Sequence, residues 1–139
     1  MAAPQTRAQT VVPFFANATL SAYRVVRYIG SNTVGYVDTT TSHILGITTQ
    51  DSQGGTGSSI AVAIAGTAKV ACAASVSSGS LVTAQSATAS GLIMEVGASQ
   101  ANTTSSAIPK ILGIALAAGS TNSVIEVLIQ PNNQSKIAF

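Results

Sequence analysis

The strictest limit on the fold comes from residues 60–65, where large apolar side chains and alanines alternate. The large side chains are β-branched and fall on one face of an extended chain, while the other face carries only Ala61, Ala63 and Ala65. Alanine is the best helix former, but the period of two and the interrupting Gly66 favour a strand. The sequence therefore predicts a β-strand that has no polar side.

Such a strand must be covered on both faces, because an uncharged strand left bare would aggregate. The cover is either another layer of sheet or a neighbouring subunit. Segment 124–130 differs, since Glu126 and Gln130 lie opposite its apolar face, as a solvated strand requires. We therefore expect Ala61, Ala63 and Ala65 to mark a contact surface, and we expect the protein to assemble.

The whole chain shares this shortage of charge. Only 7% of its residues are charged and the net charge is +2, whereas about 25% charged residues is typical. The hydrophobic share of 46% is too high for a disordered chain. A surface made of small neutral residues suits close packing against another protein, because little charge must be desolvated.

Short segments rich in β-branched and aromatic residues recur along the chain, with turn residues between them. They cover residues 10–15, 23–29, 34–37, 43–48, 60–73, 81–84, 92–96, 111–116 and 124–130. We predict an all-β fold, a small antiparallel β-barrel or β-sandwich. Residues 10–131 would form a single β domain, with residues 1–9 as a flexible N-terminal arm and residues 132–139 as a C-terminal tail.

The chain contains an internal echo. The sequence Ile-Leu-Gly-Ile occurs at residues 44–47 and again at 111–114, and each copy precedes a polar loop and an alternating apolar segment. The echo is either chance among Ile- and Val-rich strands or the sign of two equivalent hairpins that close one barrel. Gly46 and Gly113 would each let another part of the chain approach closely at a bend.

No catalytic or metal-binding pattern is present. His43 is the single histidine and Cys72 the single cysteine, without ligand-like spacing, and there is no G-x-S-x-G nucleophile motif. Gly54 opens a glycine-rich loop that lacks the P-loop lysine. We expect no catalytic residues, no cofactor, no metal and no small-molecule substrate. Cys72 is expected to be buried and inert.

Other partner classes also lack their signatures. Basic residues are scattered rather than clustered, which argues against nucleic-acid binding. No apolar run reaches about 18 residues, so we expect no membrane span. Residues 1–10 have no apolar core, so we expect no secretion signal and synthesis in the cytoplasm.

Two residue types that are typical of interfaces, Phe and Arg, mark further candidate contact positions. Phe14 and Phe15 follow Pro13, which favours an edge strand, and paired aromatics there could dock in a partner's groove; alternatively they cap the core. Arg24 and Arg27 are also of an interface type, but period two places them on opposite faces. The C-terminal tail, residues 132–139, ends in Phe139 and could act as a second docking arm.

Residues 43–81 and their return at 111–130 resemble bacteriophage capsid decoration, or cement, proteins. The resemblance rests on the order of an ILGI strand, a loop, an apolar strand, then Gly66-Thr67-Ala68-Lys69-Val70 and Gly79-Ser80-Leu81-Val82. It implies a compact β fold, a homotrimer and binding to the major capsid protein on the exterior of the virion. It transfers no catalytic residues.

Two alternatives remain at this stage. A bacterial surface or fibre subunit, such as an adhesin-like or pilus-like module, shares the composition rich in Ser, Thr and Ala, but no secretion signal is visible. A carbohydrate-binding or other small-ligand barrel would need clustered aromatics, and the chain has no Trp and only 4% aromatic residues.

Overall fold

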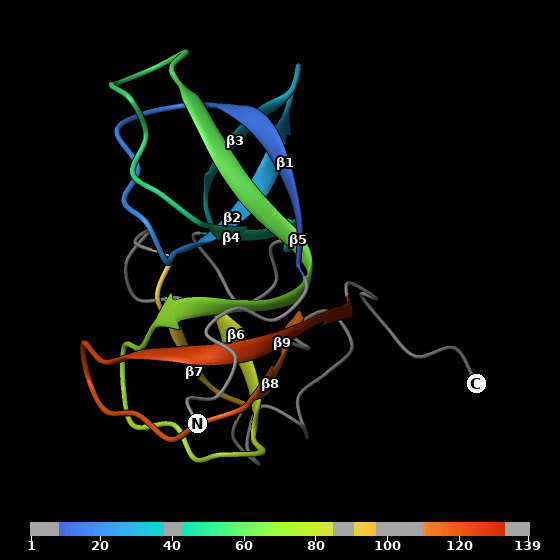
Figure 1. The fold of residues 1–139 in the computed structure, drawn as a ribbon, viewed down its shortest axis with the longest axis vertical. Helices are drawn as coiled ribbons and strands as arrows, with labels where there is room; N and C mark the ends of the chain where they lie inside the picture. Colours follow the sequence, from blue (N-terminus) through green and yellow to red (C-terminus); the bar gives the residue numbers. More distant parts are fainter. Residues whose placement is uncertain (1–8, 38–42, 85–90, 97–109, 133–139) are drawn as a thin grey trace, which may run out of the picture.

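The structure, a computed structural model, describes residues 9–37, 43–84, 91–96 and 110–132. Within them the chain forms strands and no helix (Figure 1). The strands are β1 (Gln9–Ala16), β2 (Val25–Gly30), β3 (Thr33–Tyr36), β4 (Gly46–Thr48), β5 (Ser59–Ala71), β6 (Leu81–Ala84), β7 (Ile93–Glu95), β8 (Ile111–Ala115) and β9 (Val124–Asn132). The all-β prediction is confirmed. These residues contain no helix that could cross a membrane.

The strands belong to one continuous sheet that closes on itself twice. The order β1-β3-β2-β4-β5 is closed because β1 also pairs with β5; we call this the first ring. The order continues β5-β9-β8-β6-β7, and a bridge between Ile93 and Cys72 leads from β7 back to the end of β5; this is the second ring. The pairings between strands are largely antiparallel, as predicted, and each ring adds one parallel contact.

β5 is shared by the two rings and is the strand predicted from the alternating segment. It runs through 13 residues, pairs with β1 and β4 in its first half, and pairs with β9 from Gly66 onward. Gly66 has a φ of +87°, a left-handed conformation that glycine adopts without steric cost. The strand therefore bends at Gly66 and enters the second ring instead of ending there (Figure 1).

The two rings repeat one topology. Each strand of the first ring, from β1 to β5, corresponds to the strand four numbers later in the second ring, from β5 to β9. The pairs of β2 and β3 recur one for one in β6 and β7: Val26↔Tyr36, Arg27↔Gly35 and Tyr28↔Val34 correspond to Val82↔Glu95, Thr83↔Met94 and Ala84↔Ile93. The parallel contact Ala16↔Val34 corresponds to Cys72↔Ile93. The chain thus contains an internal structural repeat, in which each ring is one copy.

The two hydrophobic cores repeat in the same way. The first ring encloses the buried residues Ala16, Leu20, Val26, Val34, Ile60 and Val62. Their counterparts in the second core are Cys72, Val76, Val82, Ile93, Ile125 and Val127. Cys72 is fully buried, as predicted, and burial raises the pKa of its thiol. The match of six buried positions in the same order means that both rings pack by one scheme.

The repeated Ile-Leu-Gly-Ile sequence is part of this repeat and not a coincidence. It places Gly46 on β4 and Gly113 on β8, which are equivalent strands. A Cβ atom at Gly46 would collide with the carbonyl oxygen of Ala63 on β5, and one at Gly113 with that of Leu128 on β9. The expected close approach is confirmed at both glycines. The two hairpins are equivalent, but they belong to two rings and do not close one barrel.

Replacing either glycine should therefore destabilise the fold. We expect Gly46→Ala and Gly113→Ala each to lower the free energy of unfolding by about 1–3 kcal/mol, because the neighbouring backbone must move to admit the methyl group. Gly54→Ala is the matched control, since its Cβ would meet nothing closer than 3.9 Å. Chemical denaturation measures all three. Equal stability of Gly46→Ala and Gly54→Ala would show that the close approach does not matter.

Candidate interaction surface

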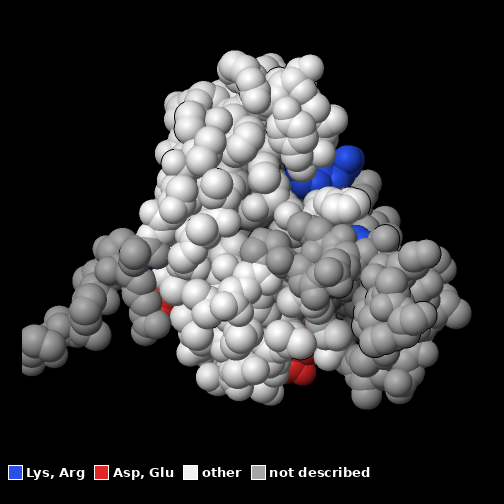
Figure 2. Space-filling model, turned by 90° about the vertical axis from the view of Figure 1, so that its right-hand side faces the viewer, with Lys and Arg blue, Asp and Glu red and all other residues white. Residues whose placement is uncertain are grey.

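The outer face of β1 is an uncharged apolar strip. Val11 and Phe15 are 42% and 49% exposed, and Pro13 between them is exposed as well. Val12 faces inward, because it pairs with the buried Val62 and paired residues share a face. Sequence analysis missed Val11, although the period of two along β1 links it to Phe15. In Figure 2 most of the visible upper part of the molecule carries no Lys, Arg, Asp or Glu.

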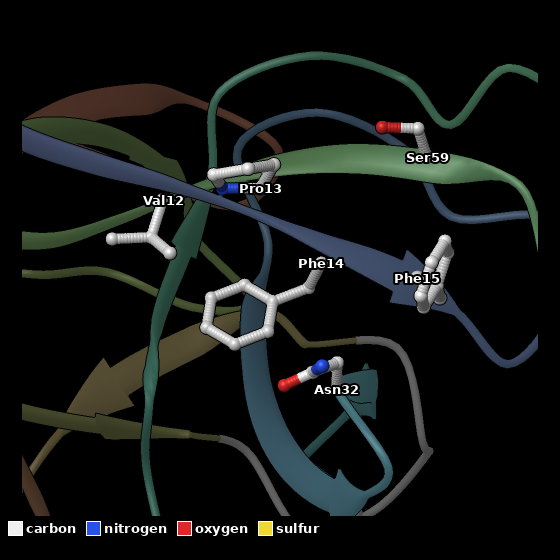
Figure 3. Close-up of a pocket in the computed structure, with 6 residues that line it drawn as sticks. All are labelled: Val12, Pro13, Phe14, Phe15, Asn32 and Ser59. Atoms are coloured by element: carbon white, nitrogen blue, oxygen red, sulfur yellow. The ribbon is translucent and has the colours of Figure 1, made fainter.

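The two phenylalanines face different ways (Figure 3). Phe14 packs against the first core, and its ring meets that of Tyr28 edge to face, with 6.2 Å between centroids. Phe15 remains half exposed. The alternative that the pair caps the core thus holds for Phe14, while Phe15 is accessible to a partner.

Beside Phe15 lies an open pocket of about 300 Å³, which we call the first-ring pocket. It is lined by Val12, Pro13, Phe14, Phe15, Asn32 and Ser59 (Figure 3). It forms where β1 reaches the β2–β3 turn, and there the Phe15 N–H donates to the Asn32 carbonyl oxygen at 2.8 Å. β1 pairs with β3 at Phe15 and Ala16 only, so Pro13 precedes that contact, consistent with the edge position expected of it.

The alanine face of β5 does not act as one surface. Ala61 is half-buried beside Pro13, and Ala65 is exposed. Ala63 is fully buried in the chain's own second core, so the hypothesis that it meets a partner is corrected. The second ring is the layer that covers it.

The remaining candidate positions are separate from the strip. Arg24 precedes β2 and Arg27 lies within it, and both are half-buried. The backbone of Arg24 is fixed by Thr48, whose N–H donates to the Arg24 carbonyl oxygen at 2.8 Å. Lys or Arg atoms come to the surface in Figure 2 where the upper and lower parts of the molecule meet. Phe139 lies outside the described residues.

The contact between the rings was not foreseen from the sequence. The Ala71 N–H at the end of β5 donates to the Tyr23 carbonyl oxygen at 2.9 Å, and the Val25 N–H donates to the Gly91 carbonyl oxygen at 2.8 Å. A Cβ atom at Gly91 would lie 2.7 Å from the Val25 oxygen, so only glycine allows this approach. We call the set of contacts around residues 23–25 the junction.

The junction also buries apolar side chains of the first ring. Val25, Ile47 and Ala63 lie on its outer face and are fully buried in the second core. They are neighbours across strands, since Val25 pairs with Ile47 and Ile47 pairs with Ala63. The first ring therefore packs against the second core through a patch of three adjacent apolar residues.

Groups that could support chemistry are sparse in the described part of the chain. No three His, Cys, Asp or Glu side chains there are grouped to hold a metal ion. Glu95 accepts hydrogen bonds from the Ser77 backbone N–H and from the Ser80 hydroxyl, the latter at 2.9 Å. The equivalent contact in the first ring is neutral, with the Ser21 N–H donating to the Tyr36 hydroxyl. Glu95 thus holds a turn in place.

The chain matches no protein-family model, and no curated protein matches its sequence. Among solved structures it is similar to the "head fiber gp8.5 N base in bacteriophage phi29". The TM-score is 0.65 at 12% sequence identity, over 95% of this chain and 100% of that one. The likeness therefore shows that the two proteins share a fold over nearly the whole of both chains.

The hydrogen bonds to Glu95 predict that its carboxyl has a lowered pKa. The hydrogen bond from the Ser77 backbone, followed by that from Ser80, lowers the pKa of Glu95 below its ordinary value of 4.5. Its stabilising effect is therefore complete above the unfolded-state pKa and is lost as the pH falls through the lowered folded-state pKa. NMR titration of the Glu95 carboxyl should give a pKa below 4.5, and Ser80→Ala should raise it. A wild-type pKa at or above 4.5 would contradict the contact.

Proposed function

We propose that this chain is a structural virion protein that binds the outer surface of an icosahedral phage capsid and stabilises the mature shell. The observation that carries the proposal is the fold shared with a head fibre base of bacteriophage phi29 over 95% of the chain. Its partners would be the major capsid protein and further copies of itself, as a homotrimer. It would be made in the host cytoplasm and have no enzymatic activity.

The surface is of the kind that such a role requires. Val11, Pro13 and Phe15 form an exposed apolar strip, and β1 carries no charged residue. Neutral apolar surface can be buried against a protein at little desolvation cost. The strip, together with the first-ring pocket, is the surface we assign to protein contacts.

The mechanism would be mass action. A ligand that binds only the mature shell stabilises it by RT ln(1 + [L]/Kd) at each site. Linked copies raise the effective concentration at neighbouring sites, so a modest affinity for each copy is enough. No chemical step is needed.

A second role is favoured by the printed name of the structural neighbour, which is the base of a head fibre. A base of this kind would occupy the capsid and carry a further element outward. Shell stabilisation distinguishes the two roles, because a fibre base need not raise the temperature at which the shell opens.

Binding to shells of the phage whose genome encodes this chain is the test. The purified protein should co-sediment with mature shells at a fixed stoichiometry and raise their thermal stability. Val11→Glu should weaken binding about tenfold, the effect of about 1.4 kcal/mol, whereas Val124→Glu should bind normally. Val124 is the matched control because its exposure is 45%, against 42% for Val11. Failure of the wild-type protein to bind mature shells would overturn the proposal, and binding without stabilisation would favour the fibre base.

A further inference from the structure

The internal repeat gives the second ring a partly exposed copy of the patch through which the first ring docks. The pairs Val25↔Ile47 and Ile47↔Ala63 recur as Leu81↔Ile114 and Ile114↔Leu128. The patch of the second ring is therefore Leu81, Ile114 and Leu128.

The segment ahead of the patch is equivalent as well. Tyr23 has a φ of +64° and Gly79 a φ of +86°. The Tyr23 N–H donates to the Thr48 carbonyl oxygen at 2.8 Å, and the Gly79 N–H donates to that of Ala115 at 2.7 Å. Residues 79–81 thus have the backbone course of residues 23–25, the segment that forms the junction.

The two patches differ in burial. Val25 and its neighbours are fully buried by the second ring, whereas Leu81 is 49% exposed and both Ile114 and Leu128 are half-buried. A large aliphatic side chain exposed at a position whose counterpart is a buried contact indicates a docking surface without its partner.

The receiving side is also duplicated, and its second copy is open. In the second ring residues 23–25 bond to Ala71 and Gly91. The first-ring counterparts of Ala71 and Gly91 are Phe15 and Asn32, and Asn32 and Gly91 both have positive φ, +60° and +72°. Phe15 and Asn32 line the first-ring pocket. The pocket is therefore the counterpart of the site that residues 23–25 occupy in the second ring.

One hydrogen bond closes the pocket at present. The Phe15 N–H donates to the Asn32 carbonyl oxygen, whereas in the second ring the corresponding groups, the Ala71 N–H and the Gly91 carbonyl oxygen, bond to Tyr23 and Val25 instead. An incoming segment would exchange this single bond for two, from the Phe15 N–H to its first residue and from its third residue to the Asn32 oxygen.

We propose that the first-ring pocket of one copy receives residues 79–81 of a second copy, which repeats between molecules the junction already present within the chain. Patch and pocket lie in different rings, so the contact is head to tail. Successive contacts of this kind either close into a small cyclic oligomer or continue as a fibre. The inference rests on the repeat and not on the virion role.

Sedimentation velocity over a range of concentrations tests the patch. The wild-type protein should self-associate, Leu81→Glu should raise the dissociation constant at least tenfold, and Val124→Glu should leave it unchanged. Val124 is similarly exposed, at 45%, but lies outside the patch. Melting curves verify that each variant folds. A wild-type protein that stays monomeric at the highest concentration, or Leu81→Glu that associates like wild type, would overturn the proposal.

Cross-linking tests the direction of the contact. Phe15→Cys and Leu81→Cys are each combined with Cys72→Ala, which removes the native thiol. Alanine is suitable because Ala16 occupies the equivalent position in the first ring. Phe15→Cys gives this position a small side chain, as at Ala71. A short bis-maleimide should link the two proteins when they are mixed and neither protein to itself. Links within Leu81→Cys alone would indicate a two-fold contact and overturn the proposal, as would the absence of links in the mixture. Neither result bears on capsid binding, which is measured separately.

Discussion

The structure depends on one shared strand. β5 closes the first ring with β1 and β4, bends at Gly66, and then opens the second ring with β9. Because one strand serves two closed sets of hydrogen bonds, neither ring can shift its register without disturbing the other. The two cores are coupled through the same strand, so both halves of the repeat must form for the fold to be complete.

Much of this arrangement could be predicted from the alternation in residues 60–65 and from the repeated Ile-Leu-Gly-Ile. The alternation identifies a strand that needs cover on both faces, and the two glycines indicate equivalent close approaches. The source of the cover could not be predicted. Ala63 is covered by the second ring of the same chain. This is because β5 bends as it leaves the first ring, which brings the second ring against the outer face of the first.

The repeat itself is hard to detect in the sequence because equivalent positions are occupied by different residue types. Ala16 and Cys72 share only small size, and Tyr36 and Glu95 share only an oxygen that accepts a hydrogen bond from a serine N–H. A parallel contact such as Ala16↔Val34 leaves no local pattern, since another strand, β2, lies between its two strands in the sequence. On the candidate surface, Phe15 could be predicted from the sequence and Val11 was missed. The junction at Val25 and Gly91, which lies between the rings, was missed as well.

One junction is filled within the chain, and the repeat leads us to propose that another copy fills its counterpart. Hydrogen exchange at increasing protein concentration measures this most directly. The Val25 amide, bonded to Gly91 inside the chain, should be protected at every concentration, while the amide of its counterpart Leu81 should become protected as copies associate. If sedimentation shows that the protein self-associates but the exchange of the Leu81 amide does not change with concentration, the second junction does not form as proposed.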